Sequence, residues 1–265
     1  MTSQPVPLYR GYAFDLDGTI YLGDELIPGA ADVVRRLREQ GSQVVFVTNK
    51  PIESNDDYVR KLTRLGIEAD ASNVISATDA LLLYLRQNAA GARILPVAEH
   101  VVIDALTNAG FEVVHDPDLA DVVVVSFDRT FDYDKLYRAY RAVGRGARIV
   151  ATNPDPYCPT PYGGLPDCAA MLAAIEACTG AKAEAIVGKP SKHMATAFLS
   201  RLGVPASSAL MVGDRLLTDV AMGLESGMDS ALVLSGATTF EQIAPSGIVP
   251  THVIDDVNAL VASAA

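Results

Sequence analysis

Asp15 and Asp17 stand two positions apart, directly after a short apolar run, in the segment FDLDGT at residues 14–19. If that run is a strand, side chains two apart point to the same face, so both carboxylates face one site. Two adjacent carboxylates repel each other unless a cation lies between them or one is protonated. The pair therefore predicts a metal site or acid–base chemistry. Gly18, which follows, permits a tight turn whose amide can face an anion.

A second acidic pair, Asp214 and Asp219, lies in VGDRLLTD at residues 212–219, again after an apolar run. A lone aspartate at such a position is often only a helix cap. Carboxylates from two strand ends, with no matching His or Cys, instead form a set of hard oxygen ligands that suits magnesium better than zinc. The two pairs together predict a magnesium site.

Groups that can bind an anion occur at two further points. Lys189, in VGKPS at residues 187–191, follows a short apolar run, although a lysine at such a position, taken alone, is more often a solvated surface charge. Thr48 and Asn49 end the run that starts at residue 43, and they offer a hydroxyl, an amide side chain and backbone amides to phosphate oxygens.

The net charge of −11 opposes non-specific binding to nucleic acid and to anionic membranes, so neither is an expected partner. It also repels a phosphorylated substrate, and a phosphate site must therefore carry its own positive charge. No apolar run approaches the roughly 20 residues of a membrane span, and the first ten residues lack the apolar segment of a signal peptide. We therefore expect a cytoplasmic protein.

Short β-branched runs alternate with amphipathic stretches along most of the chain, which is typical of parallel strands joined by helices. The fold class is therefore α/β. Strands are predicted at residues 10–14, 43–47, 92–97, 111–114, 121–126, 148–151, 185–187, 209–212 and 230–234. Helices are predicted at residues 29–40, 56–66, 101–109, 133–143, 192–203 and 217–227, and the Pro-rich stretch 154–166 is predicted to be a loop.

In their order along the chain, DLDGT (15–19), Thr48-Asn49, Lys189 and Gly213-Asp214 with Asp219 resemble the four motifs of the haloacid-dehalogenase-like (HAD) phosphatases. FDLDGTIYLG, ATNPD, VGKPS and LVLSG are similar to segments of the NagD-type subfamily, subfamily IIA. Residues 146–176 and 219–236 resemble the AraL-type sugar phosphatases most closely. Lys50, Pro51 and Arg215 depart from the pattern of many relatives, and their roles stay open.

The resemblance implies a Rossmann-like parallel-sheet core formed by residues 1–78 and 183–265, with an inserted α/β cap of the C2 type at residues 79–182. It implies a Mg²⁺-dependent phosphatase in which Asp15 attacks phosphorus and Asp17 acts as general acid and then general base. Whether caps pair into a homodimer stays open.

The resemblance also distributes roles among the other residues. The Asp15 carboxylate, the Asp17 backbone carbonyl and Asp214 are expected to hold Mg²⁺. Asp219 is expected to orient Lys189 or the water shell of the metal, and Gly18 to support the turn. Lys189 is expected to neutralise the charge of the phosphoryl group. Thr48 and Asn49 are expected to donate hydrogen bonds to the phosphoryl oxygens.

The expected substrate is a small phosphorylated metabolite, by preference a sugar phosphate. Nucleoside monophosphates, phosphoglycolate, glycerol phosphate and pyridoxal phosphate stay open, as does a sugar-phosphate sensor without activity. A signalling receiver domain has about half this length, and Ser-His-Asp hydrolysis lacks its G-x-S-x-G segment here. The loop at residues 152–168 is the expected selector of the leaving group, through Asp155, Tyr157, Tyr162 and Asp167.

Overall fold

The computed structural model describes residues 5–160 and 163–261, and the chain forms two compact units. The first unit contains Met1–Thr48, Asn55–Ile75 and Met194–Ala265. The second contains Asn49–Ser54 and Ser76–His193. Each unit has its own parallel sheet, which confirms the predicted α/β class. The assignment of residues 1–78 and 183–265 to a catalytic core, and of residues 79–182 to a cap, stays a prediction.

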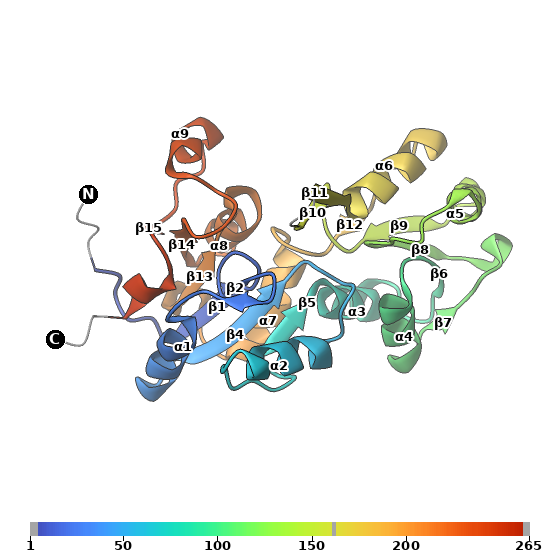
Figure 1. The fold of residues 1–265 in the computed structure, drawn as a ribbon. Helices are drawn as coiled ribbons and strands as arrows, with labels where there is room; N and C mark the ends of the chain where they lie inside the picture. Colours follow the sequence, from blue (N-terminus) through green and yellow to red (C-terminus); the bar gives the residue numbers. More distant parts are fainter. Residues whose placement is uncertain (1–4, 161–162, 262–265) are drawn as a thin grey trace. The chain divides into compact units, whose positions relative to one another are not determined.

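The first unit is built on a six-stranded sheet with the strand order β15-β14-β13-β1-β4-β5 (Figure 1). Its strands are β1 (Gly11–Asp15), β4 (Gln43–Thr48), β5 (Val74–Ser76), β13 (Ala209–Gly213), β14 (Asp229–Val233) and β15 (His252–Ile254). Strand β1 lies between β4 and β13 and is parallel to both. Its whole length is buried, which explains why it reads as an almost unbroken apolar run.

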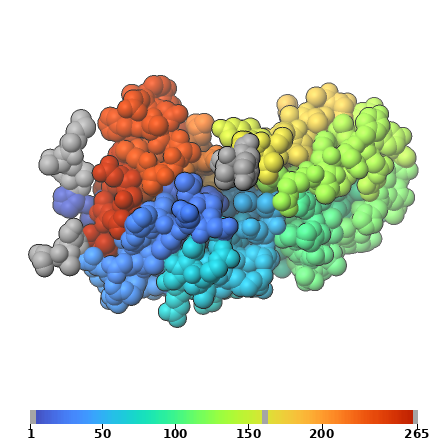
Figure 2. All heavy atoms as spheres, in the orientation of Figure 1, coloured from blue at the N-terminus to red at the C-terminus, as the bar shows by residue number. Residues whose placement is uncertain are grey.

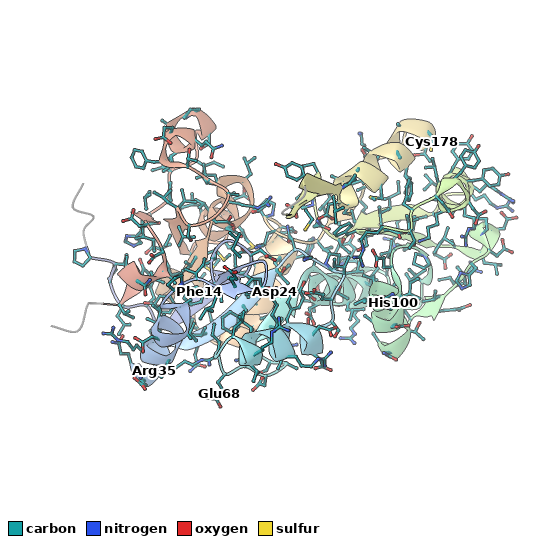
Figure 3. The ribbon with its side chains drawn as sticks, viewed as in Figure 1. Phe14, Asp24, Arg35, Glu68, His100 and Cys178 are labelled. Carbon is teal, nitrogen blue, oxygen red and sulfur yellow. The ribbon has the colours of Figure 1, made fainter. Side chains whose placement is uncertain are left out.

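Two amphipathic helices contribute apolar side chains to the core of this unit: α1 (Ala30–Glu39) and α2 (Asn55–Arg64). Leu37 of α1 and Leu62 of α2 pack in one cluster with Phe14 and Phe46 of the sheet. Phe14, which is labelled in Figure 3, is fully buried.

An N-terminal and a C-terminal segment of the described residues lie side by side in the first unit, where blue and red atoms adjoin (Figure 2). The Asn258 side chain, in the short helix η5 (Val257–Leu260), donates to the Pro28 carbonyl at 2.9 Å. A Cβ at Gly29, whose φ is 86°, would overlap that asparagine. The close approach of these segments therefore requires glycine at this position.

The second unit contains a five-stranded parallel sheet with the order β12-β9-β8-β6-β7. Its strands are β6 (Arg93–Val97), β7 (Glu112–Val113), β8 (Val122–Val125), β9 (Arg148–Ala151) and β12 (Ala185–Ile186). Its helices are α3 (Ala77–Asn88), α4 (His100–Asn108), α5 (Tyr133–Gly144) and α6 (Cys168–Thr179). Apolar side chains of β6, β8, β9, α5 and α6 share a single core.

The Pro-rich stretch at residues 154–166 is not the single loop that the sequence predicts. It contains an antiparallel hairpin of β10 (Tyr157–Thr160) and β11 (Gly163–Pro166). Proline lacks the amide that a strand ladder uses, so proline-rich strands escape pattern-based prediction.

The remaining elements connect or extend the two sheets. They are β2 (Tyr21–Leu22), β3 (Glu25–Leu26), α7 (Lys192–Leu202), α8 (Ala221–Glu225), α9 (Ile243–Ser246), a π-helix at Leu216–Val220 and the short helices Pro117–Leu119, Ala206–Ser208 and Phe240–Gln242. Within the described ranges, no helix combines the length and the apolar character that a membrane crossing requires.

Candidate active site

Polar side chains gather at the carboxyl edge of the first unit's sheet. Asp15 is the last residue of β1, Thr48 is the last residue of β4, and Asp214 directly follows β13. Because these three strands are neighbours and parallel, their carboxyl ends meet at one edge, which is where ligands bind in open α/β sheets. All three side chains are buried, although the residues are polar.

Three carboxylates converge at this edge. One oxygen from each of Asp15, Asp214 and Asp219 lies within 4.8 Å of the other two, and all three residues are buried. Negative charges held this close in a buried place repel one another strongly unless a cation offsets them. The donor set consists of hard oxygens with no His or Cys, which is the chemistry that Mg²⁺ takes. These residues therefore fit a bound magnesium ion.

The Asp214 carboxylate is held in a close-fitting backbone cradle. The Ala237 amide donates to its Oδ2 at 2.6 Å, and the Ser235 hydroxyl donates to the Gly18 carbonyl at 2.8 Å. A Cβ on either Gly18 or Gly236 would overlap Asp214. Small residues at these two positions thus let main chain from two loops approach the carboxylate.

Gly18 contributes to this cradle in a different way from the one the sequence predicts. Its φ of 87° confirms the tight turn, but its amide donates to the Tyr21 carbonyl at 2.7 Å rather than facing an anion. Ser235 and Gly236 belong to the LVLSG segment that resembles the NagD-type subfamily, but no site role is predicted for them from the sequence. Their signal is a Ser-Gly pair that follows β14, the strand beside β13, after one intervening residue.

Asp219 reaches the acidic cluster from a π-helix at Leu216–Val220, which precedes α8. The Arg215 amide donates to Asp219 Oδ2 at 3.1 Å, and a Cβ at Gly213 would overlap Asp219. Single π turns are frequent at functional sites. The side chain of Asp17 is half-buried and is not part of the cluster. Its predicted metal contact is through the backbone carbonyl, and that contact stays a prediction.

The second unit holds the other predicted phosphate-binding residues. Lys189 follows β12, and only 3% of it is exposed. Asn49 Oδ1 accepts from the Lys189 amide at 2.7 Å, and Asn49 Nδ2 donates to the Lys189 carbonyl at 3.1 Å. Nδ2 also donates to Asp155 Oδ2 at 2.8 Å. Both hydrogens of this amide group therefore have protein partners, so the predicted donation from the Asn49 side chain to phosphate would require one of them to be given up.

The predicted selector segment divides into buried and exposed parts. Asp167 is buried, accepts from the Cys168 amide at the start of α6, and accepts from Asn153 Nδ2 at 3.2 Å. Burial is the main reason that the pKa of Asp167 rises from 3.8 to about 6. Tyr157, on β10, is 54% exposed. Tyr162 lies outside the described residues.

Family models match two parts of this chain. Residues 12–112 match a model described as haloacid dehalogenase-like hydrolase, and residues 186–260 match a second one described as HAD-hydrolase-like. The sugar-phosphatase AraL of Bacillus subtilis is 36% identical over 258 residues, which cover 97% of this chain and 94% of that protein. The chain belongs to the haloacid dehalogenase-like hydrolases.

Solved structures of this hydrolase family share the fold over nearly the whole chain. A p-nitrophenyl phosphatase from Archaeoglobus fulgidus superposes with a TM-score of 0.91 at 32% identity, and the match covers 96% of this chain and 98% of that one. NagD from E. coli K-12 superposes with a TM-score of 0.88 at 29% identity, covering 97% and 99%. The predicted family, the relation to NagD and AraL, and the assignment as a phosphatase are confirmed.

Proposed function

We propose that this HAD-like phosphatase is a magnesium-dependent hydrolase of small phosphomonoesters, with sugar phosphates as its natural substrates. The observation that carries the proposal is the buried cluster of Asp15, Asp214 and Asp219 at the carboxyl edge of the sheet. A buried set of three carboxylates is costly to fold without a counter-charge. A cation held there, together with a lysine, supplies the local positive charge that an acidic protein needs to accept a phosphate dianion.

The proposed reaction has two steps. In the first, an Asp15 carboxylate oxygen attacks phosphorus in line, the bond from phosphorus to the ester oxygen breaks, and Asp17 gives its proton to the leaving alcohol. In the second, Asp17 takes a proton from water, which attacks the aspartyl-phosphate and releases inorganic phosphate and the free Asp15 carboxylate. The two steps together consume one water and regenerate both aspartates.

In this proposal, protein groups around the phosphate offset its negative charge. Lys189 neutralises the phosphoryl oxygens, and the Thr48 hydroxyl and the backbone amides beside it donate to them. The Asp15 and Asp214 carboxylates and the Asp17 carbonyl would hold magnesium, with Asp219 supporting them directly or through water. When bound, the ion offsets the repulsion between an anionic nucleophile and an anionic phosphate.

The choice of sugar phosphates follows the similarity to a sugar phosphatase over almost the entire chain. In the proposed mechanism the core residues bind phosphate and metal, so the leaving group would be recognised by other residues. A panel of sugar phosphates, nucleoside monophosphates, phosphoglycolate, glycerol phosphate and pyridoxal phosphate tests this choice. The highest kcat/KM should fall on a sugar phosphate, and a preference for any other class would overturn it.

The reaction itself is tested by Asp15→Asn with p-nitrophenyl phosphate as substrate. The amide is a poor nucleophile and a weaker cation ligand, so turnover should fall to background and the rise in Tm on adding MgCl₂ should shrink. Asp24→Asn is the matched control, because Asp24 (labelled in Figure 3) is exposed and its surface pairs with Arg64 and Lys61 contribute about 1 kcal/mol each at most. Parental turnover by Asp15→Asn, or full turnover of the parent in excess chelator, would refute the proposed mechanism.

A further inference from the structure

A chain of side-chain hydrogen bonds in the second unit leads to the main chain of Lys189. The Asn49 side chain binds both main-chain polar groups of Lys189: it accepts from the Lys189 amide at 2.7 Å and donates to the Lys189 carbonyl at 3.1 Å. Asp155 Oδ2 accepts from Asn49 Nδ2 at 2.8 Å and from Asn153 Nδ2 at 2.9 Å. Asp155 is thus two contacts away from the lysine that the proposed reaction uses.

The loops that carry these residues fit closely against each other. The Gly188 amide donates to the Thr152 carbonyl at 2.7 Å. A Cβ at Gly188 would come within 2.6 Å of Asn49 Oδ1 and within 2.5 Å of the Thr152 oxygen. The turn after β9 and the turn after β12 therefore approach each other closely, and the partly buried Asn49 side chain lies against Gly188.

The carboxylate of Asp155 helps to fix which way the Asn49 amide faces. An ionised carboxylate only accepts hydrogen bonds, so the NH₂ end of Asn49 must face Asp155. The Asn49 Oδ1 atom then faces the Lys189 amide, which can only donate. The Lys189 carbonyl, which like the carboxylate only accepts, favours the same orientation. If the amide turned over, its oxygen would face Asp155 and the Lys189 carbonyl and its NH₂ group would face the Lys189 N–H, and all three contacts would be lost.

We propose that Asp155 is a positioning residue of the phosphatase reaction: through the Asn49 amide it fixes the main chain of Lys189 and thereby the place of the lysine ammonium group. This inference rests on the proposed role of Lys189 toward the phosphate. The ammonium is carried on a flexible four-carbon stem, so its position depends on a fixed backbone. A misplacement of about 1 Å in a catalytic arrangement can lower the rate by roughly 10²-fold.

The test is a double-mutant cycle on kcat for p-nitrophenyl phosphate with Asp155→Ala, Lys189→Ala and the double variant. Asp155→Ala should lower kcat by about 10- to 10²-fold, with a smaller change in KM. In the Lys189→Ala background the same substitution should have little further effect, because the group that it positions is already gone. Asp155→Asn can place its oxygen where Oδ2 lies, accept both bonds and restore most of the activity.

Asp132→Ala is the control for a simple loss of stability. Asp132 caps α5 in the same unit by accepting from the Lys135 amide at 2.8 Å, and it takes no part in the contacts around Lys189. Its loss should lower the Tm as much as, or more than, Asp155→Ala does, while kcat stays at the parental value. If Asp155→Ala does not fold, Asp155→Ser replaces it in the same cycle.

The outcomes separate the two proposals. Equal losses from Asp155→Ala in both backgrounds, or parental kcat in Asp155→Ala, would overturn the positioning role alone. Parental kcat in Lys189→Ala would overturn the role of Lys189 in the proposed function, and the positioning role with it. A loss of kcat in both single variants that is not additive in the double variant supports both.

Discussion

Asp17 allows acid–base chemistry to be separated from nucleophilic attack at the level of one residue. Its side chain is not among the clustered carboxylates, and its predicted metal contact uses only the backbone carbonyl. Asp17→Asn should therefore leave the magnesium-induced rise in Tm nearly intact while kcat for an alkyl phosphate falls by roughly 10²- to 10⁴-fold. A variant as active as the parent would show that another group moves the proton.

The raised pKa of Asp167 gives a second prediction at the scale of one residue, on how stability depends on pH. Burial raises its pKa from 3.8 to about 6, so between these two pH values the folded protein binds more protons than the unfolded chain. This group therefore contributes a stability that falls as pH rises from about 4 to 6 and does not return above that range. A shift of this size corresponds to roughly 3 kcal/mol.

Asp167→Asn removes the titration and keeps an oxygen that can cap α6 and accept from Asn153. The free energy of unfolding in urea should increase for the variant relative to the parent as the pH rises from 4 to 7. Asp116→Asn is the control, because its exposed carboxylate caps only a short helix at Pro117–Leu119. A constant difference between parent and Asp167→Asn across this pH range would contradict the prediction.

At the scale of elements, the hairpin of β10 and β11 replaces the whole 152–168 loop as the expected selector of the leaving group. Asp167 is buried and caps α6, whereas Tyr157 is 54% exposed on β10 and lies against Gly164 of β11. An exposed aromatic side chain on a paired strand presents a surface for binding with little conformational freedom to lose.

Tyr157→Ala should therefore change the ratio of kcat/KM values among natural phosphates by about 10-fold or more, while hydrolysis of p-nitrophenyl phosphate changes little. Tyr133→Ala is the matched control, since Tyr133 is an exposed tyrosine on α5 of the same unit. Parallel losses on every substrate, or no loss on any, would exclude this side of the hairpin as the selector.

At the scale of the whole molecule, the net charge of −11 acts against the proposed substrate. A phosphate dianion approaches a surface of its own sign, whereas the attraction at the site acts over a short range between buried groups. Salt screens exposed and distant charges more than buried and adjacent ones. The electrostatic penalty on approach should therefore decrease as ionic strength increases.

We expect kcat/KM for p-nitrophenyl phosphate to rise severalfold between about 10 and 150 mM NaCl at constant free magnesium, with kcat nearly unchanged. The measurement is a set of initial rates with potassium acetate as a second salt, which controls for specific effects of chloride. A steady fall in kcat/KM over the same range would mean that local attraction dominates the approach of the substrate.

Much of the fold and part of the site follow from the sequence alone. Alternating apolar and amphipathic runs give the α/β class, because the periods of strands and helices are local properties of the chain. The same logic places Asp15, Thr48 and Asp214 at strand ends, since each directly follows an apolar run. The position of Lys189 after a strand is likewise predicted from the short apolar run that precedes it.

Tertiary structure alone decides which of these residues meet and what their side chains do. Asp219, which lies in a π-helix, joins Asp15 and Asp214 in one buried cluster. Asn49 turns toward Lys189, 140 positions away, and toward Asp155, 106 positions away. Hydrogen bonds between such distant positions depend on how strands are ordered and how turns approach each other, and no local period or composition encodes that. The sequence therefore predicts which residues belong to the candidate site, whereas tertiary packing determines which of them contact one another.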